Sequence, residues 1–318
     1  VGLGAQGRGH APAQRAARLS PAAVTEIMET TMHIILGATG HVGSALAEAL
    51  LAKGQPVTVV TRHASKTEAL RKKGAKVAVV DVFDVPAFQR VLAGGKRLFL
   101  LNPPAAPSTD TAAEERRSLR SILRAVQGAN LEKIVAESAY GAQPGERIGD
   151  LGVLHEMEQA LAAQPIPTAV IRAAYYMSNW DLSLRTAQEQ GVVHTMYPVD
   201  FALPMVAPRD LGQFAARLME GPAKDSGPHH VEGPEPYTSA DVAEAFALAL
   251  DKPVRAVQTP RSQWEHAFRA MGFSDAGAAS YAAMTRITLE RKYEVENPER
   301  GRVPLREYIG ALVRSRSG

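Results

Sequence analysis

Three glycines at positions 37, 40 and 43 have the spacing of a turn that binds phosphate. They lie in the stretch GATGHVG, after the apolar run HIIL at 33–36 and before a segment whose apolar residues have helical spacing. The first glycine would allow a tight turn off a strand, the second would let a pyrophosphate approach the backbone, and the third would let the helix pack on a sheet. Because the N–H groups that begin a helix favour anions, this segment predicts a site for the pyrophosphate of a dinucleotide. The residues expected to hold it are Gly37, Thr39, Gly40, His41 and Val42.

Two other interpretations of this turn were considered. A P-loop is excluded because no Gly-Lys-Ser or Gly-Lys-Thr follows the glycines. A turn that serves only to pack a helix on a strand is the other alternative, and the strand before and helix after the glycines favour the dinucleotide.

The next strand-like segment, PVTVVTRH at 56–63, indicates which dinucleotide is bound. Enzymes that bind NAD usually carry Asp or Glu at the end of this strand, whereas an arginine there accommodates the 2'-phosphate of NADP. Here the strand ends in Thr61 and Arg62, with His63 and Lys66 close behind. We therefore expect NADP, with NADPH preferred over NADH and Arg62 at the 2'-phosphate. The alternative is a solvated basic loop.

Segments with strand and helix character alternate through the first half of the chain. Further strands are expected at KVAVVDVFD, RLFLL, KIVAESAYG and TAVIR, with a helical segment before each of the last two. Such alternation requires right-handed crossovers and a parallel sheet. We predict an α/β fold, with a doubly wound parallel sheet of the Rossmann type over 32–172 and a smaller C-terminal α/β region, which carries the substrate cleft, over 173–318.

Ligands of doubly wound sheets bind beyond the carboxyl ends of the strands. Residues that follow the third, fourth, fifth and sixth strands should therefore surround the cofactor. They are Asp81, Val82, Phe83, Asn102, Pro103, Ser138, Ala139, Tyr140, Ala174 and Tyr175.

The first 31 residues differ from the rest in composition. They are rich in Gly, Ala, Pro and Arg and show no apolar period, so we expect a disordered extension or one that is not native, with Met28 or Met32 as the natural start. A transit peptide is the alternative. Gly2, Gly4 and Gly7 formally match G-x-G-x-x-G, but no strand precedes them, so the match is attributed to chance.

Composition narrows the function further. The chain has 318 residues, a net charge of +3 and no cysteine, which excludes disulfides and thiolate chemistry. No apolar run is long enough to span a membrane, and basic residues do not cluster with aromatic ones. We expect no membrane segment and no nucleic-acid partner, and the cytoplasm is the default location.

The segments GATGHVGS, LLNPP and TAVIRAAYYMSNW, with the TR that ends the second strand and the Asp-x-x-Asp after the third, resemble the NmrA-like family of atypical short-chain dehydrogenases. The resemblance extends from Met32 to about Leu312. It implies a Rossmann domain with a smaller region that closes over the substrate cleft. The family includes NADPH-dependent quinone and triphenylmethane dye reductases, and also NADP-sensing regulators without activity.

Typical short-chain dehydrogenases use a tyrosine with a lysine four residues later as the proton donor or acceptor. No Tyr-x-x-x-Lys occurs here, since Tyr140, Tyr175 and Tyr176 are followed at that distance by Pro, Asn and Trp. Oxidation of ordinary alcohols and sugar-nucleotide epimerisation by that mechanism are therefore disfavoured. A quinone or a cationic dye can accept hydride with little acid–base help, because its own conjugation takes the charge.

Two histidine sites were considered for chemistry. HEMEQ at 155–159 has Gln159 in place of the second histidine of a zinc motif, and the adjacent His229 and His230 are expected in a loop rich in Gly and Pro, so no metal site is expected. The resemblance implies a histidine or lysine near the nicotinamide four residues before Glu158, where Leu154 stands with His155 next to it. His155 and Tyr140 are the catalytic candidates, and a surface position is the alternative for His155.

Aromatic residues follow the sixth strand where the cleft should open. Tyr176 and Trp180 are the candidate substrate contacts, and a place in the core is the alternative, with equal weight, for Trp180. We expect an NADPH-dependent reductase of a quinone-like or other conjugated small molecule. A homodimer is the candidate assembly of the protein. The alternative is a non-catalytic NADP-binding redox sensor. At Thr238–Asp241 a capping box should begin a helix, and Asp210 is expected to cap another.

Overall fold

The computed structural model describes residues 31–316. The predicted N-terminal extension, except for Thr31, lies outside the described residues.

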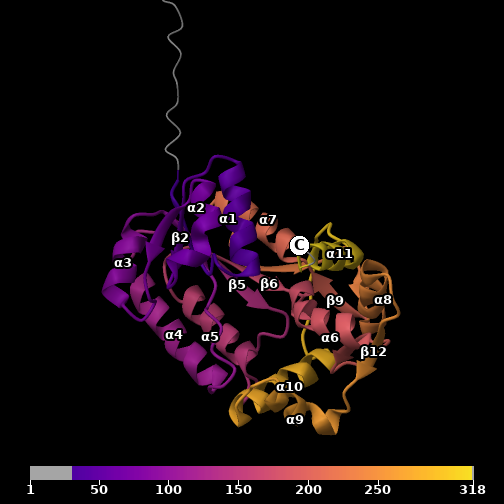
Figure 1. Cartoon of the computed structure of the whole chain (residues 1–318). Coiled ribbons are helices and arrows are strands. Elements are labelled where there is room, and N and C mark those ends of the chain that lie inside the picture. Colours follow the sequence, from indigo (N-terminus) through magenta and orange to yellow (C-terminus); the bar gives the residue numbers. More distant parts are fainter. Residues whose placement is uncertain (1–30, 317–318) are drawn as a thin grey trace, which may run out of the picture. The chain divides into compact units, whose positions relative to one another are not determined.

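A large parallel sheet forms the centre of the described part (Figure 1). Its strand order is β13-β10-β6-β5-β4-β1-β2-β3, and every adjacent pair runs parallel. The strands are β1 (His33–Leu36), β2 (Val57–Thr61), β3 (Lys76–Val79), β4 (Arg97–Leu100), β5 (Lys133–Ala139), β6 (Thr168–Ala173), β10 (Gly227–Glu232) and β13 (Glu299–Arg300). The predicted doubly wound Rossmann sheet is confirmed.

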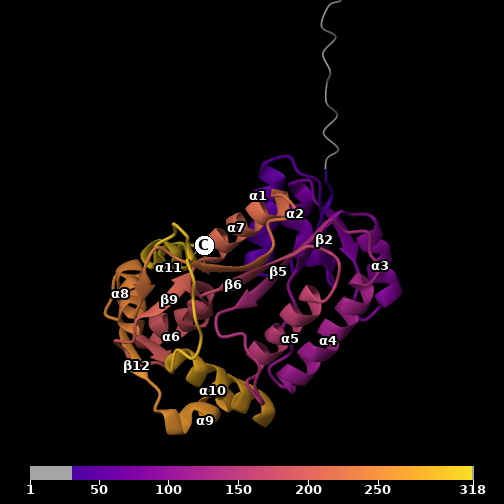
Figure 2. The same ribbon diagram turned by 180° about the vertical axis from the view of Figure 1, so that it is seen from behind.

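Helices cover both faces of this sheet (Figures 1 and 2). One face carries α1 (His41–Ala52), α2 (Glu68–Lys72) and α7 (Pro208–Glu220), and the other carries α3 (Val85–Ala93), α4 (Thr111–Val126) and α5 (Asp150–Ala162). Each face has its own apolar core, as a sheet buried on both sides requires. Helix α7 approaches α1 closely at Gly212, where a β-carbon would come within 2.6 Å of Ala45.

The C-terminal half forms a second region with smaller sheets. One sheet has the order β11-β9-β7 and the other pairs β12 with β8, and a third apolar core lies between them and the neighbouring helices. The strands are β7 (Tyr175–Tyr176), β8 (Val192–Thr195), β9 (Leu203–Val206), β11 (Pro236–Tyr237) and β12 (Arg255–Gln258). The helices are α6 (Ser183–Gln190), α8 (Ser239–Leu250), α9 (Trp264–Ala270), α10 (Asp275–Leu289) and α11 (Leu305–Arg316), with short 3-10 turns η2 (Met177–Leu182) and η3 (Arg261–Gln263). A further 3-10 turn, η1 (Ala64–Thr67), lies between β2 and α2 in the first half.

The large sheet also contains strands from beyond residue 172, where the sequence predicts the Rossmann domain to end. Strands β10 and β13 pair into the large sheet beside β6, and α7 packs against α1. The chain therefore leaves the large sheet after β6 and returns to it twice.

The capping box at Thr238 is confirmed, because its side chain accepts the Asp241 N–H and Asp241 accepts the Thr238 N–H. The expectation that Asp210 caps a helix is wrong. Asp210 lies inside the first turn of α7, and its carboxylate accepts the backbone N–H groups of Arg302 and Val303, each at 2.9 Å. It ties the C-terminal segment to α7.

His229 and His230 also differ from their predicted setting. Both lie in β10 and not in a loop. Their side chains alternate across the strand, with His229 against Phe214 and His230 against Tyr140. None of the helices within residues 31–316 is long and apolar enough to cross a membrane.

Candidate cofactor and substrate site

The glycine turn after β1 has the geometry that the sequence predicts. Gly37 has a φ of +85°, a conformation that favours glycine, and the Gly40 N–H donates to the Gly37 carbonyl at 3.0 Å. At Gly43 a β-carbon would lie 2.3 Å from the Gly37 carbonyl oxygen, so only glycine fits. At Gly40 the corresponding distance is 3.4 Å, which is an ordinary contact. Packing within the protein therefore requires Gly43, whereas it leaves room for a side chain at Gly40.

Helix α1 begins at this turn without a side chain that caps it. Its N-cap residue is Gly40, and its first turn contains no acidic residue. Thr39 and His41 are exposed, whereas Val42 is buried and offers a ligand only its backbone. The Gly40 N–H already donates to Gly37, so the groups available to an anion are the first N–H groups of α1 itself, together with the helix dipole.

Arg62 lies directly beyond β2. The Thr61 hydroxyl accepts the His63 N–H at 3.0 Å and donates to the His63 carbonyl at 3.2 Å, which closes the turn around Arg62. The Arg62 side chain is exposed and has no ion pair or hydrogen bond with any residue in the described part of the chain. This guanidinium is therefore free to bind a phosphate group placed at the end of β2, such as the 2'-phosphate of NADP.

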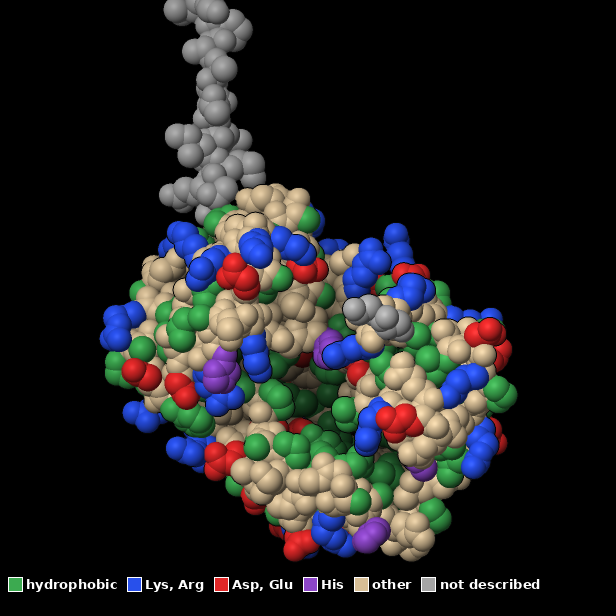
Figure 3. All heavy atoms as spheres, viewed as in Figure 1, with side chains coloured by type: hydrophobic (Ala, Val, Ile, Leu, Met, Phe, Trp, Pro, Cys, Tyr) green, Lys and Arg blue, Asp and Glu red, His purple; other side chains and the backbone are tan. Residues whose placement is uncertain are grey.

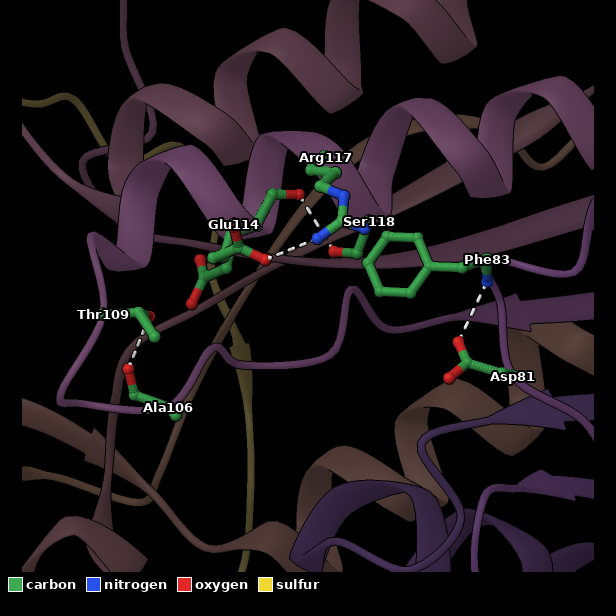
Figure 4. A network of polar contacts seen from close by, with 8 residues as sticks. Asp81, Phe83, Ala106, Thr109, Glu114, Arg117 and Ser118 are labelled. Atoms are coloured by element: carbon green, nitrogen blue, oxygen red, sulfur yellow. Dashed lines mark hydrogen bonds and ion pairs between the residues drawn. The ribbon is translucent and has the colours of Figure 1, made fainter.

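The turn after β3 presents an aromatic ring (Figure 4). Asp81 accepts the Phe83 N–H at 3.0 Å, Val82 is buried, and the Phe83 ring is 40% exposed. The Arg117 guanidinium, which also pairs with Glu114, lies 4.5 Å from the centre of this ring. A planar base at this end of the sheet could stack on the exposed part of Phe83. The sequence did not single out Arg117.

The segment after β4 is held by hydrogen bonds to α4. Asn102 donates to the Glu115 carbonyl at 3.1 Å and accepts the Ser118 hydroxyl at 2.9 Å, so its side chain is engaged within the protein. The Glu115 carboxylate accepts the Ala105 N–H at 3.0 Å. Pro103, between these contacts, is half-buried. Asn102 thus shapes this wall of the site.

A buried carboxyl pair, missed in the sequence, lies behind this segment. Burial, with a smaller effect of the neighbouring Asp150, raises the pKa of Glu115 to about 8. Burial also raises the pKa of Asp150, and Tyr281 of α10 interacts with this carboxyl. A usable signal existed, since Glu115 lies four residues before Leu119 on the apolar face of its helix.

The ends of β5 and β6 are joined by a polar network. Ser138 donates to Glu158 of α5 at 2.6 Å, and Arg172 makes a two-pronged contact with the same carboxylate, at 2.6 and 3.1 Å. The Ser138 hydroxyl is therefore directed into the protein, and the Ala174 N–H donates to β10. Ser138, Ala139 and Ala174 can meet a cofactor mainly through their remaining backbone groups.

Tyr140, a catalytic candidate, is buried. Its hydroxyl donates to Glu232 at 3.0 Å, and burial with the adjacent Glu232 raises the pKa of Tyr140 well above its usual range. Its ring contacts those of His230 and Tyr293, and together with Arg172 these residues line a cavity of about 230 Å³. The hydroxyl therefore keeps its proton in a structural hydrogen bond.

His155, the other candidate, lies on the face of α5 that also carries Leu151 and Glu158, at spacings of four and three residues. It is half-buried, and its Nδ1 is buried without a hydrogen-bond partner among residues 31–316. His155 is therefore not the fully exposed surface residue that the alternative interpretation expects.

The aromatic residues after β6 fall into two groups, some at the wall of the candidate site and one in the C-terminal core. Tyr176 donates to Glu137 at 2.8 Å, and burial raises the pKa of this glutamate to about 8. Tyr175 is half-buried, with its ring 6.0 Å from that of Trp180. Trp180 is only 4% exposed and belongs to the C-terminal core, which favours the core alternative over a direct substrate contact.

The space-filling view shows where these residues leave room (Figure 3). The face drawn there is hollowed near its middle, where Figure 1 places the carboxyl ends of β5 and β6. Hydrophobic side chains line the hollow, and basic and histidine side chains stand at its rim. Within residues 31–316, no group of three His, Asp or Glu side chains is arranged to hold a metal ion.

Known proteins that resemble this chain include several reductases. The NAD(P)H azoreductase of Xenophilus azovorans is 22% identical over 251 residues, which cover 77% of this chain and 82% of the azoreductase. Triphenylmethane reductase of Citrobacter sp. has a TM-score of 0.70 at 19% identity, over 89% of this chain and 99% of that one. An NADPH-dependent quinone oxidoreductase of Escherichia coli has a TM-score of 0.65 at 22% identity, over 88% and 99%. Residues 29–299 match the sequence profile of the NmrA-like family, and the chain belongs to that family.

Proposed function

We propose that this protein is an NADPH-dependent reductase that transfers hydride to a quinone-like or other conjugated small molecule. The observation that carries the proposal is the turn from β1 to α1, where a glycine with positive φ and an uncapped helix start leave N–H groups for a pyrophosphate. The azoreductase, triphenylmethane reductase and quinone oxidoreductase relatives support it.

The assignment of NADPH rests on Arg62. A nicotinamide dinucleotide supplies a hydride when bound. The chain's own residues determine whether NADPH or NADH binds more tightly. Arg62 is exposed beyond β2 with no partner among the described residues, and no acidic residue occupies its place. A guanidinium there would bind the 2'-phosphate and would leave the ribose hydroxyls of NAD without their usual acceptor.

The proposed acceptor class follows from which groups can donate protons. The Tyr140 hydroxyl donates to Glu232, and no tyrosine is followed by a lysine at the required spacing. We propose His155 as the proton donor at this end of the sheet. Its Nδ1 has no hydrogen-bond partner among the described residues. An acceptor whose conjugation holds the negative charge needs only one such proton after hydride arrives. The hydrophobic hollow and the half-buried Tyr175 and Tyr176 suit a flat apolar molecule.

The test is oxidation of NADPH by the purified protein against quinones, triphenylmethane dyes and azo compounds, followed by the absorbance of reduced nicotinamide. Saturable turnover with one class would support the reductase. Tight NADPH binding without turnover across the panel would favour the non-catalytic redox sensor, for which the absent tyrosine–lysine pair is the specific observation. A cytoplasmic location, a homodimer and the predicted domain limits stay predictions.

A further inference from the structure

A chain of side chains connects the glycine turn to the C-terminal region. His41, the first residue of α1, is 62% exposed, and its Nε2 lies 3.6 Å from Oδ2 of Asp181 in η2. Asp181 is only 19% exposed, and its Oδ1 accepts the Tyr308 hydroxyl of α11 at 2.7 Å. One carboxylate therefore contacts groups from α1 and α11 at the same time.

Asp181 is the fixed member of this chain. The preceding Trp180 is buried in the C-terminal core, and the Tyr308 hydroxyl holds one carboxylate oxygen. Burial raises the pKa of Asp181, and the Tyr308 hydroxyl, followed by His41 and then Arg316, offsets part of that rise. His41 has Asp181 as its one side-chain partner in the described part of the chain. Among the described residues, this carboxylate is therefore the side chain against which the imidazole lies.

The imidazole lies beside the helix start at which the pyrophosphate is proposed to bind. Because Nε2 of this ring faces the Asp181 carboxylate, Nδ1 lies on the side of the ring away from that carboxylate. With a proton on each nitrogen, one ring can donate to a phosphate oxygen and to Asp181 together. No acidic side chain in the first turn of α1 competes for this position.

We propose that Asp181 is a positioning residue for the cofactor, which holds the His41 imidazole over the N-terminus of α1 so that it binds the pyrophosphate. This inference rests on the proposed function. It makes the C-terminal region, which follows the aromatic wall at Tyr175 and Tyr176, a contributor to cofactor binding.

The test is a double-mutant cycle on the dissociation constant for NADPH, with His41→Ala, Asp181→Asn and the double variant. Each single change should weaken binding by about tenfold, the size of one hydrogen bond to a charged group. The double variant should be no weaker than His41→Ala, because Asp181 acts through His41. Asp181→Asn should raise KM for NADPH with kcat unchanged, and Tyr308→Phe should have a smaller effect in the same direction.

Two comparisons separate positioning from a general loss of charge or fold. Glu307→Gln removes an exposed acid from α11 and should leave NADPH binding unchanged. Asp181→Asn should weaken NADH and NADPH by the same factor, since both carry the pyrophosphate, whereas Arg62→Ala should affect NADPH alone. The thermal midpoint of each variant checks the fold.

Unchanged or tighter NADPH binding by Asp181→Asn would overturn the inference, as would additive losses in the double variant. If the wild type binds neither NADPH nor NADH, the proposed function fails and the inference with it. If the wild type binds NADPH and Asp181→Asn binds it equally well, only the inference fails.

Discussion

Among single residues, Arg62 carries the assignment of the cofactor. Replacing it by alanine should weaken NADPH binding by about 10- to 100-fold, the worth of a charge-assisted contact to the 2'-phosphate, and should leave NADH binding nearly unchanged. The sequence predicts residue roles best where chemistry depends on the backbone: the glycine turn could be predicted because a positive φ at position 37 and the tight contact at position 43 admit essentially one residue type. Asn102 was expected at the cofactor, yet its side chain bonds to α4, a partner that sequence spacing does not reveal. Trp180 was equally suited to wall or core, and only packing distinguishes the two.

The Arg62→Ala variant is compared with wild type on both cofactors. Titration of both reduced cofactors into wild type and variant measures the ratio. Equal losses for the two cofactors would show that Arg62 does not read the 2'-phosphate.

The hydroxyl of Tyr140 can be tested separately. Because its proton is donated to Glu232 and its pKa is raised, Tyr140→Phe should leave kcat within about threefold of the wild type. His155→Ala should lower kcat by about 10- to 100-fold if its buried nitrogen supplies the proton. Steady-state rates with one saturating acceptor decide between them, and the opposite order would make Tyr140 the proton donor.

At the scale of elements, the strands and helices of the first half follow their sequence patterns. Strands β1 to β6 were predicted because apolar runs alternate with helical spacing. The C-terminal half was less predictable. Strands β7, β11 and β13 contain two residues each, too few for any alternation to be visible. The return of β10 to the sheet depends on pairing with β6 across a long stretch of chain.

Asp210 supplies a prediction about how these elements are joined. Its carboxylate satisfies two backbone N–H groups of the segment before α11, so Asp210→Ala should lower the free energy of unfolding by about 2–4 kcal/mol. Asp210→Asn, which keeps an acceptor, should cost less. The exposed Asp200 provides the control, since Asp200→Ala should change stability by less than about 0.5 kcal/mol. Denaturant unfolding measures all three, and equal costs for Asp210→Ala and Asp200→Ala would contradict the assigned role.

At the scale of the whole molecule, buried carboxyl groups make stability depend on pH. The pKa values of Glu115 and Glu137 are each raised to about 8 in the folded protein, chiefly by burial. The folded state then binds more protons than the unfolded state between the ordinary glutamate pKa and about 8. Stability should therefore fall as pH rises through this interval. Neither group was foreseen, although each interrupts an apolar pattern in the sequence.

Glu137→Gln isolates this effect. The amide cannot ionise. The free energy of unfolding of the variant should therefore rise by about 1–3 kcal/mol relative to that of the wild type between pH 5 and pH 9. Glu189→Gln, at an exposed position of α6, should show no such gain. Unfolding curves at both pH values provide the comparison, and parallel pH profiles for wild type and Glu137→Gln would mean that Glu137 is already ionised in the folded state.

The assignment of the β1–α1 turn to the cofactor is best tested by the affinity of wild type and Gly40→Ala for NADPH, with thermal midpoints measured alongside. The structure accommodates a β-carbon at Gly40, 3.4 Å from the nearest atom, so the variant should fold, with its midpoint lowered by only a few degrees because alanine is a poorer N-cap than glycine. The same methyl group would stand where the pyrophosphate approaches the backbone. We predict that wild type binds NADPH and that Gly40→Ala loses at least about tenfold in affinity. No binding by wild type, or equal binding by both proteins, would contradict the assignment of this turn to the cofactor.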